Sequence, residues 1–264
     1  MIPVLSIDYI PKRIPHREKY VKTLTSLHSA VLVGPIGVGK TLTLFKAFSR
    51  NLLRATAYMY RTKYSLLREL VSRIVGVPRR GVRFEDLLSL LIDTSMERGL
   101  VVAIDDADYL IKRGFELSDP AESLFESLVK SDVRVFIVIH SRYYLQYIPI
   151  SNIVEYHGYT HSELEEILYS RVEEAEDLIQ QHEDEILKWF LRNINDDVII
   201  LTSRIVGCDT GGSGDCRLAL EILNRACMYA YAEGRGLGEE HVRRAYLDTL
   251  DPETLRTYYE SHIL

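Results

Sequence analysis

The chain has 264 residues, 47% of them apolar and 27% charged, and a formal net charge of -6, a composition typical of one large or two medium globular units. It contains no uncharged apolar run of about 18 residues that could span a membrane and no apolar signal-peptide core near its start. Its three cysteines fit neither a metal site nor a disulfide framework. The acidic balance argues against a uniformly basic nucleic-acid binder. We therefore expect a cytoplasmic protein with reduced thiols and no membrane partner.

The charge is divided unevenly along the sequence. Between Arg50 and Arg83 there are nine basic residues and one acid, whereas between Glu155 and Glu185 there are eleven acids and one arginine. Each segment has an ordinary interpretation as a solvated helix surface. The alternative is that the two segments face different partners.

The first part of the chain alternates strands with helices. Apolar runs predict buried strands at residues 30–33, 56–60, 100–104 and 133–139, with a weaker strand at 153–156. Helical patterns occupy residues 40–49, 64–75 and 84–98. Asp119-Pro120 is typical of an N-cap followed by proline and predicts a helix to about residue 130. This order predicts an α/β fold with a five-stranded parallel sheet and helices on both faces.

After Tyr159 the pattern is helical throughout. Thr160 and Glu163 form a capping-box pattern at the start of the first helix. Further helices are expected at residues 184–193, 196–205, 215–232 and 239–247, with a glycine-rich loop at 207–214. We therefore predict two domains, an α/β domain at residues 1–157 and an all-α domain at 158–264.

A phosphate-binding motif lies between the first predicted strand and the helix that follows it. Glycines allow successive backbone N–H groups to point at phosphates, and the helix N-terminus adds its dipole. The lysine meets β/γ charge and the threonine hydroxyl binds Mg²⁺. The residues expected at ATP or ADP are Gly34, Pro35, Ile36, Gly37, Val38, Gly39, Lys40, Thr41 and Leu42.

Two acids, Asp105 and Asp106, end the apolar strand at residues 100–104. The carboxyl ends of parallel strands meet at one edge of a sheet, so these carboxylates are expected beside the phosphate-binding loop. Asp105 would hold Mg²⁺ through water, and Asp106 would polarise the attacking water. The alternative is a buried strand whose terminal acids are only solvated.

The sequence resembles the archaeal origin-recognition and cell-division-control replication initiators, a family of AAA+ P-loop ATPases. The resemblance rests on the segment from Tyr9 to Glu18, the phosphate-binding loop, Asp105-Asp106-Ala107-Asp108, the Tyr159 to Arg171 pattern and Gly214-Asp215-Cys216-Arg217. These segments span nearly the whole chain. The implied protein is an AAA+ core with a helical lid.

The resemblance also implies roles for single residues. Pro15 and Arg17 lie in the segment that lines the adenine pocket in this family. Arg217 corresponds to the sensor-2 arginine, whose guanidinium can grip γ-phosphate oxygens. The sensor-1 position falls at Ser141 or, as a second choice, His140, where the family usually has asparagine. For Arg217 a surface arginine, and for Ser141 a turn residue, are the simpler interpretations.

Three departures from the family bear on activity. Asp106 stands where the family has glutamate, and no arginine-finger segment is recognisable after Ser141, with Arg142 a weak candidate. Family members continue into a winged-helix DNA-binding domain, whereas this sequence stops at Leu264. We expect either a truncated initiator or a natural short form.

The expected function is an ATP-binding, slowly hydrolysing replication-initiation switch that binds duplex DNA and associates with itself or a replication protein near the nucleoid. Arg79, Arg80 and Arg83 are the candidate contacts to DNA phosphates, by resemblance to a helical insertion of the family. The alternative is a nucleotide-locked scaffold that recruits a protein partner with little hydrolysis or DNA binding. A small-molecule kinase is disfavoured, because nothing after Tyr159 resembles a phosphoacceptor lid.

Overall fold

The computed structural model describes residues 1–77, 81–180 and 183–250. The chain divides into two compact units. One unit is Arg17–His157, and the other combines Met1–His16 with the chain from Gly158 onward. Within the described ranges, no helix is both long enough and apolar enough to cross a membrane.

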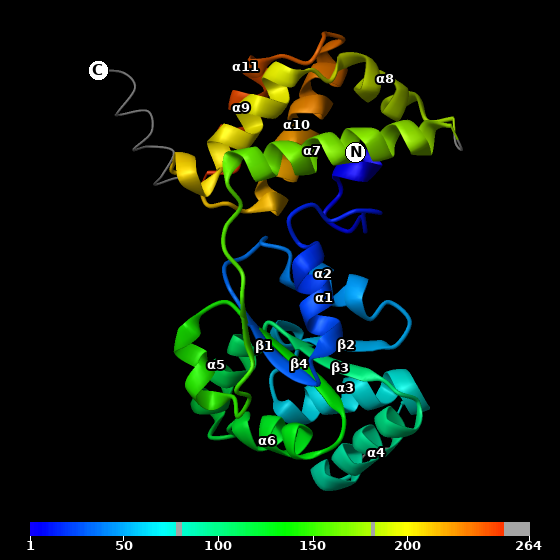
Figure 1. Ribbon diagram of the computed structural model, residues 1–264, viewed down its shortest axis with the longest axis vertical. Coiled ribbons are helices and arrows are strands. Elements are labelled where there is room, and N and C mark those ends of the chain that lie inside the picture. The colour runs from blue at the N-terminus through cyan, green and yellow to red at the C-terminus, as the bar shows by residue number, and fades with distance from the viewer. Residues whose placement is uncertain (78–80, 181–182, 251–264) are drawn as a thin grey trace. The chain divides into compact units, whose positions relative to one another are not determined.

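The Arg17–His157 unit is built on a five-stranded sheet in the order β2-β3-β4-β1-β5, and every pairing is parallel (Figure 1). The strands are β1 (Ser29–Val33), β2 (Leu52–Thr56), β3 (Val101–Asp105), β4 (Arg134–Ile139) and β5 (Ile153–Glu155). This confirms the predicted fold class. Because the strands are parallel, the loops after β1, β3 and β4 all leave the sheet at the same edge.

Helices cover both faces of this sheet. The α2 side buries Leu24, Leu44 and Phe48 against alternate strand residues such as Ala103, and the opposite side buries residues of α3, α4, α5 and α6 against Val102 and its neighbours. The helices are α1 (Glu18–Ser26), α2 (Lys40–Ala47), α3 (Lys63–Val75), α4 (Phe84–Glu97), α5 (Ala107–Leu117) and α6 (Glu122–Lys130). The strands read as continuous apolar runs because both of their faces are buried.

The second strand differs from the sequence prediction. Residues 56–60 are expected as a strand, but β2 is Leu52–Thr56 and is followed by a 3-10 turn at Ala57–Met59. Leu53 and Ala55 are buried in alternation along β2, whereas Tyr58 and Met59 are 54% and 66% exposed. Tyr58 and Met59, two of the residues that suggest a strand, therefore lie on the surface.

The chain after β3 also differs from the sequence prediction, in one additional helix and in the start of the predicted one. No helix is expected at Ala107–Leu117, yet α5 begins directly after Asp106, which adopts φ 53° and makes no side-chain cap. A capping signal is therefore absent from this helix start. Helix α6 begins at Glu122 rather than after Asp119, because Asp119 instead pairs with Lys63 at 2.8 Å and its N–H closes the end of α5.

The second unit is helical, as predicted. Its helices are α7 (His161–Ile179), α8 (Glu185–Asn193), α9 (Asp196–Val206), α10 (Cys216–Glu233) and α11 (Glu239–Leu247). Thr160 and Glu163 form the expected capping box, and Asp184, Asn195 and Asp215 cap the next three helices with side-chain oxygens. These caps are the sequence signals that place the helix starts.

The amino-terminal segment packs with the helical unit. Ile2, Val4 and Leu5 are buried in the core of that unit, and the Ile2 N–H donates to Asn224 Oδ1 at 2.9 Å. The predicted ranges of 1–157 and 158–264 assign these residues to the nucleotide-binding core. The compact units change over at His157 and Gly158, but Met1–His16 lies with the helices.

Candidate nucleotide-binding site

The phosphate-binding loop connects β1 to α2. Gly34 has φ 155°, and a Cβ at this position would lie 2.3 Å from the backbone oxygen of Tyr156. Gly37 and Gly39 also have positive φ values, 73° and 88°. The loop therefore needs glycine both for its backbone conformation and for its close approach to the segment after β5.

Lys40, the first residue of α2, is buried and points back into this loop. Its Nζ donates to the carbonyl oxygens of Gly34 at 2.6 Å and Pro35 at 2.5 Å. The ammonium group thus lies at the amino end of α2, where the helix dipole also favours negative charge. A phosphate group at this position would meet a lysine that the loop already holds in place.

Thr41 and Asp105 lie together across the loop. The Thr41 hydroxyl donates to Asp105 Oδ2 at 2.8 Å, and Asp105 is 3% exposed at the end of β3. A hydroxyl and a carboxylate are hard oxygen ligands of the kind that Mg²⁺ prefers, so this donor pair fits the cation expected from the sequence. Arg54 Nε lies 3.2 Å from the same carboxylate oxygen.

Asp106, Asp108 and His140 form a second polar cluster at this edge of the sheet. His140 Nδ1 lies 3.0 Å from Asp108 Oδ1, and its Nε2 lies 3.4 Å from Asp106 Oδ1. Burial raises the pKa of Asp108, but the hydrogen bond and charge of His140 together lower this pKa by more, so the net shift is downward. His140 therefore joins the two acids that follow β3.

Ser141, the first choice for sensor 1, has a different role in the structure. Its side chain is exposed and caps the 3-10 turn at Arg142–Tyr147 by accepting the Tyr143 N–H at 3.3 Å. The next residue, Arg142, pairs with Glu155 at 2.7 Å. The residue after β4 that contacts the acid cluster is His140, because the chain turns away from the sheet edge at Ser141.

Arg17 braces the phosphate-binding loop from its own unit. It is 5% exposed, and its Nε donates to the Val38 carbonyl at 2.8 Å while Nη2 donates to the His157 carbonyl at 2.9 Å. Pro15 lies in the helical unit, where it lines a pocket of about 350 Å³ beside α7. The segment that the sequence assigns to adenine thus divides between the two units at His16 and Arg17.

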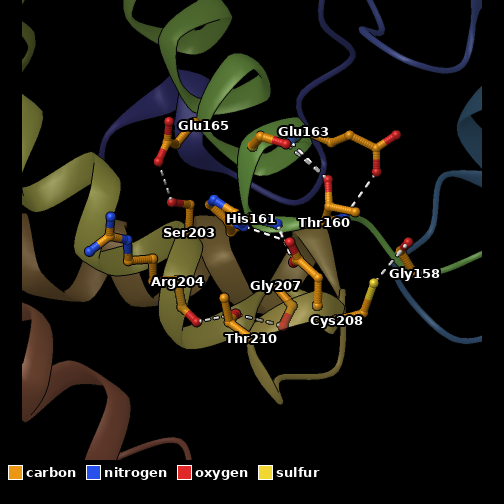
Figure 2. Close-up of polar contacts among 12 residues, drawn as sticks. Gly158, Thr160, His161, Glu163, Glu165, Ser203, Arg204, Gly207, Cys208 and Thr210 are labelled. Atoms are coloured by element: carbon orange, nitrogen blue, oxygen red, sulfur yellow. Dashed lines mark hydrogen bonds and ion pairs between the residues drawn. The ribbon is translucent and has the colours of Figure 1, made fainter.

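Arg217 is exposed in the first turn of α10. The loop before this helix contacts the start of α7 and the end of α9: His161 Nδ1 lies 2.6 Å from Asp209 Oδ2, and the Thr210 hydroxyl donates to the Arg204 carbonyl at 2.6 Å (Figure 2). Gly214 has φ 67°, and a Cβ there would lie 2.6 Å from Gly158 Cα. The position of Arg217 within the helical unit is therefore fixed by close backbone packing.

The candidate DNA contacts are described only in part. Arg79 and Arg80 lie outside the described residues. Arg83 is exposed before α4, and its Nη2 pairs with Asp86 Oδ1 at 3.0 Å. Its charge is thus partly balanced by a neighbouring acid.

Sequence analysis misses Arg54 and Asp108 as members of the site. Arg54 stands in the sequence as one of nine basic residues, and its place beside Asp105 follows only from the correct position of β2. The spacing of the acids could have identified Asp108, because it lies three residues after Asp105 and in the first turn of the helix that starts there. Alternation along β2 is the signal that locates Arg54.

Known proteins are similar to this chain in sequence and in fold. A family model described as an AAA domain matches residues 26–144. The ORC1-type DNA replication protein 2 of Sulfurisphaera tokodaii is 29% identical over an alignment that covers 92% of this chain and 64% of that protein. The Aeropyrum pernix ORC2 protein, solved as ADPNP–ADP complexes, has a TM-score of 0.74 at 21% identity, over 96% of this chain and 73% of that one. The Aeropyrum pernix ORC1 protein in complex with DNA has a TM-score of 0.72 at 22% identity, over 93% of this chain and 68% of that one.

The parallel sheet, the loop between β1 and α2 and the match of residues 26–144 to an AAA domain show an AAA+ fold. In sequence the chain is similar to archaeal ORC1-type replication proteins over most of its length, in agreement with the resemblance found from its motifs. It spans about two thirds, 64% to 66%, of the length of the first three curated relatives that it matches.

Proposed function

We propose that this protein binds ATP and hydrolyses it slowly, as a nucleotide-dependent switch in the initiation of DNA replication. The observation that carries the proposal is the pairing of Thr41 with Asp105 at 2.8 Å beside the buried Lys40. A lysine, a hydroxyl and a carboxylate in this arrangement are suited to a triphosphate with its cation.

The role of each residue in the site follows from its chemistry. The loop N–H groups and Lys40 bind the β- and γ-phosphates, while Thr41 and Asp105 would hold Mg²⁺. When bound, Mg²⁺ neutralises negative charge that develops on the phosphates. Asp106 orients the attacking water and accepts its proton, and His140, itself held by Asp108, fixes the Asp106 carboxylate.

The phosphate-binding role is tested by Lys40→Ala, with Lys46→Ala on the same helix as the matched control. We expect Lys40→Ala to abolish binding of a fluorescent ATP analogue, because no other cation of the loop can replace an ammonium at the amino end of α2. Lys46 is in the last turn of α2, away from that end, so its variant should bind like wild type. Tight binding by Lys40→Ala would refute the assignment.

The switch itself is assigned to the helical unit. Arg217 would read the γ-phosphate, so ATP and ADP would favour different arrangements of the protein. Arg217→Ala should reduce the preference for ATP over ADP in competition binding, whereas Arg225→Ala in the same helix should keep it. An unchanged ATP preference in Arg217→Ala would remove Arg217 from the switch.

The second candidate function is a nucleotide-locked scaffold that recruits a protein partner. The observation that favours it is Asp106, which is one methylene shorter than the glutamate typical of the resembling family and stands against His140. Phosphate release by Asp106→Asn separates the two functions. A large loss supports the ATPase, and release equal to wild type supports the scaffold.

DNA binding is proposed for the basic segment that includes Arg79, Arg80 and Arg83. The support is the excess of basic residues between Arg50 and Arg83 and the description of the Sulfurisphaera relative as a DNA replication protein. Changing the three arginines to alanine should weaken duplex binding at moderate salt and lower the dependence of affinity on salt. Unchanged affinity in a fluorescence anisotropy titration would contradict this proposal.

A further inference from the structure

Arg54 belongs to the site but takes no part in the proposed function. It comes from the middle of β2, where Leu53 and Ala55 are buried in the core shared with α3 and α4. Side chains alternate along a strand, so Arg54 and Thr56 point to the opposite face of the sheet, where α2 packs. In the register of the sheet, Thr56 lies opposite Asp105.

Three contacts hold the Arg54 side chain in this place. Its Nε lies 3.2 Å from Asp105 Oδ2, and its Nη2 donates to Thr56 Oγ1 at 2.7 Å. Its Cζ lies 5.2 Å from the ring centroid of Phe45, a residue of α2. The side chain is 28% exposed, so the guanidinium is fixed rather than free in solvent.

The guanidinium and Thr41 share one oxygen of Asp105. Oδ2 accepts the Thr41 hydroxyl at 2.8 Å and faces Arg54 Nε, while Oδ1 accepts the Asp106 N–H at 3.2 Å. The carboxylate oxygen beside Thr41 is the one on which a Mg²⁺ ion and its water would depend. That oxygen already has a positive neighbour from the protein itself.

We propose that Arg54 competes with the divalent cation for Asp105 and thereby sets how tightly the site holds that cation. The guanidinium is a positively charged group whose planar N–H donors suit a carboxylate. Guanidinium and Mg²⁺ are attracted by the same oxygen and repel each other at short range. The metal is therefore held more weakly than Thr41 and Asp105 alone would hold it. This inference rests on the proposed function only in that the cation accompanies the nucleotide.

The test is the affinity of the full chain for Mn²⁺, measured from the free-ion signal by electron paramagnetic resonance, both alone and with ADP. Arg54→Met keeps an apolar stem for the Phe45 contact but removes the charge, and it should bind Mn²⁺ about tenfold more tightly than wild type. Arg54→Lys, which keeps the charge, should lie near wild type. Arg98→Met is the matched control, because Arg98 lies before β3, whereas Asp105 ends that strand, and Arg98 Nη1 donates to the Ile74 carbonyl at 2.9 Å.

The outcomes decide the proposal without ATPase activity. Equal or weaker Mn²⁺ binding by Arg54→Met, or an equal gain in Arg98→Met, would overturn it. If Arg54→Met does not fold, Arg54→Gln provides the same test: it also removes the charge beside Asp105 and should tighten Mn²⁺ binding, and no gain would overturn the proposal. Binding of a fluorescent ADP analogue in EDTA is measured separately. Its absence would refute the proposed nucleotide site, while Mn²⁺ binding to the protein alone would still decide the role of Arg54.

Discussion

Glu174 in the helical unit and Asp105 in the Arg17–His157 unit are buried carboxylates that contact several donors, and the two are held in different ways. Glu174 in α7 is 5% exposed and accepts the Lys12 N–H at 2.7 Å and the Tyr9 hydroxyl at 2.7 Å. Asp105 accepts the N–H of the next residue, Asp106, but its more distant partners are two side chains, the hydroxyl of Thr41 and the guanidinium of Arg54. A backbone donor such as the Lys12 N–H cannot move without moving the chain, whereas the hydroxyl and the guanidinium can exchange for a ligand.

The partners of Glu174 suit a role in stabilising the fold, whereas those of Asp105 suit a role in binding a ligand. Glu174 fastens the segment before His16 to α7, and Arg171, buried with its Cζ 5.3 Å from the Tyr9 ring, supplies the neighbouring positive charge. Asp105 contacts Thr41 and Arg54 of its own unit and the N–H of the next residue. Removal of Glu174 should therefore damage the fold, and removal of the Asp105 charge should damage function.

The largest expected effect is that of Glu174→Ala. It removes the acceptor of Tyr9 and Lys12 and leaves Arg171 buried without its counterion, which should cost about 3 kcal/mol of unfolding free energy. Trp189 is the single tryptophan of the chain and lies in α8, so its fluorescence during urea unfolding reports on the helical unit alone. Glu176→Ala, an exposed site on the same helix, should change little. A loss of unfolding free energy below about 1 kcal/mol would contradict the structural role of Glu174.

The next effect is that of Asp105→Asn. An amide keeps the shape of the carboxylate but cannot balance a divalent cation, so ATP hydrolysis should fall by about a hundredfold or more. The urea midpoint from far-UV circular dichroism, which reports on the unit that contains Asp105 as well as on the helical unit, should stay at the wild-type value. A fall in that midpoint equal to the one in Glu174→Ala would show that Asp105 is architectural as well.

A smaller effect is expected from Tyr9→Phe. The mutation removes one hydrogen bond to Glu174 and should cost about 1 kcal/mol at neutral pH. Burial, followed by the hydrogen bond to Glu174, raises the pKa of Tyr9 to about 12. A raised phenol pKa gives stability that is present below about pH 10 and is lost as pH rises toward 12. Wild type should therefore lose more stability than Tyr9→Phe over that range, as measured by Trp189 fluorescence.

The smallest effect concerns the acid cluster beside Asp105. The pKa of Asp108 is lowered on balance, since the hydrogen bond and charge of His140 outweigh the effect of burial. A lowered carboxyl pKa gives stability that is present above about pH 4 and is lost as pH falls through the folded value. His140→Ala should reduce this acid-dependent loss, measured by tyrosine circular dichroism. If the acid transition of His140→Asp were identical to that of wild type, the result would contradict the role assigned to the histidine.

The sequence predicts the parts of the molecule that carry local signals. The phosphate-binding loop needs glycines at fixed positions, and the caps at Thr160, Asp184 and Asp215 are side-chain hydrogen bonds to nearby residues. Three buried apolar strands are visible because both of their faces are covered. These features depend on neighbours in the chain.

The features that sequence analysis misses depend on distant partners. Strand β2 is at the edge of the sheet, and its pairing with β3 places it at Leu52–Thr56 although the aromatic run lies further along. That shift hides Arg54 from the predicted site. His140 rather than Ser141 meets the acids because the chain turns after β4, which no spacing reveals.

The packing of Met1–His16 on the helical unit has a consequence for the order of folding during synthesis. Residues 1–16 are synthesised before Glu174 and Asn224, which bind Tyr9, Lys12 and Ile2. All the strands of the Arg17–His157 sheet also precede these partners in the chain. Ile2, Val4 and Leu5 therefore cannot be buried in the helical core until that core has been synthesised.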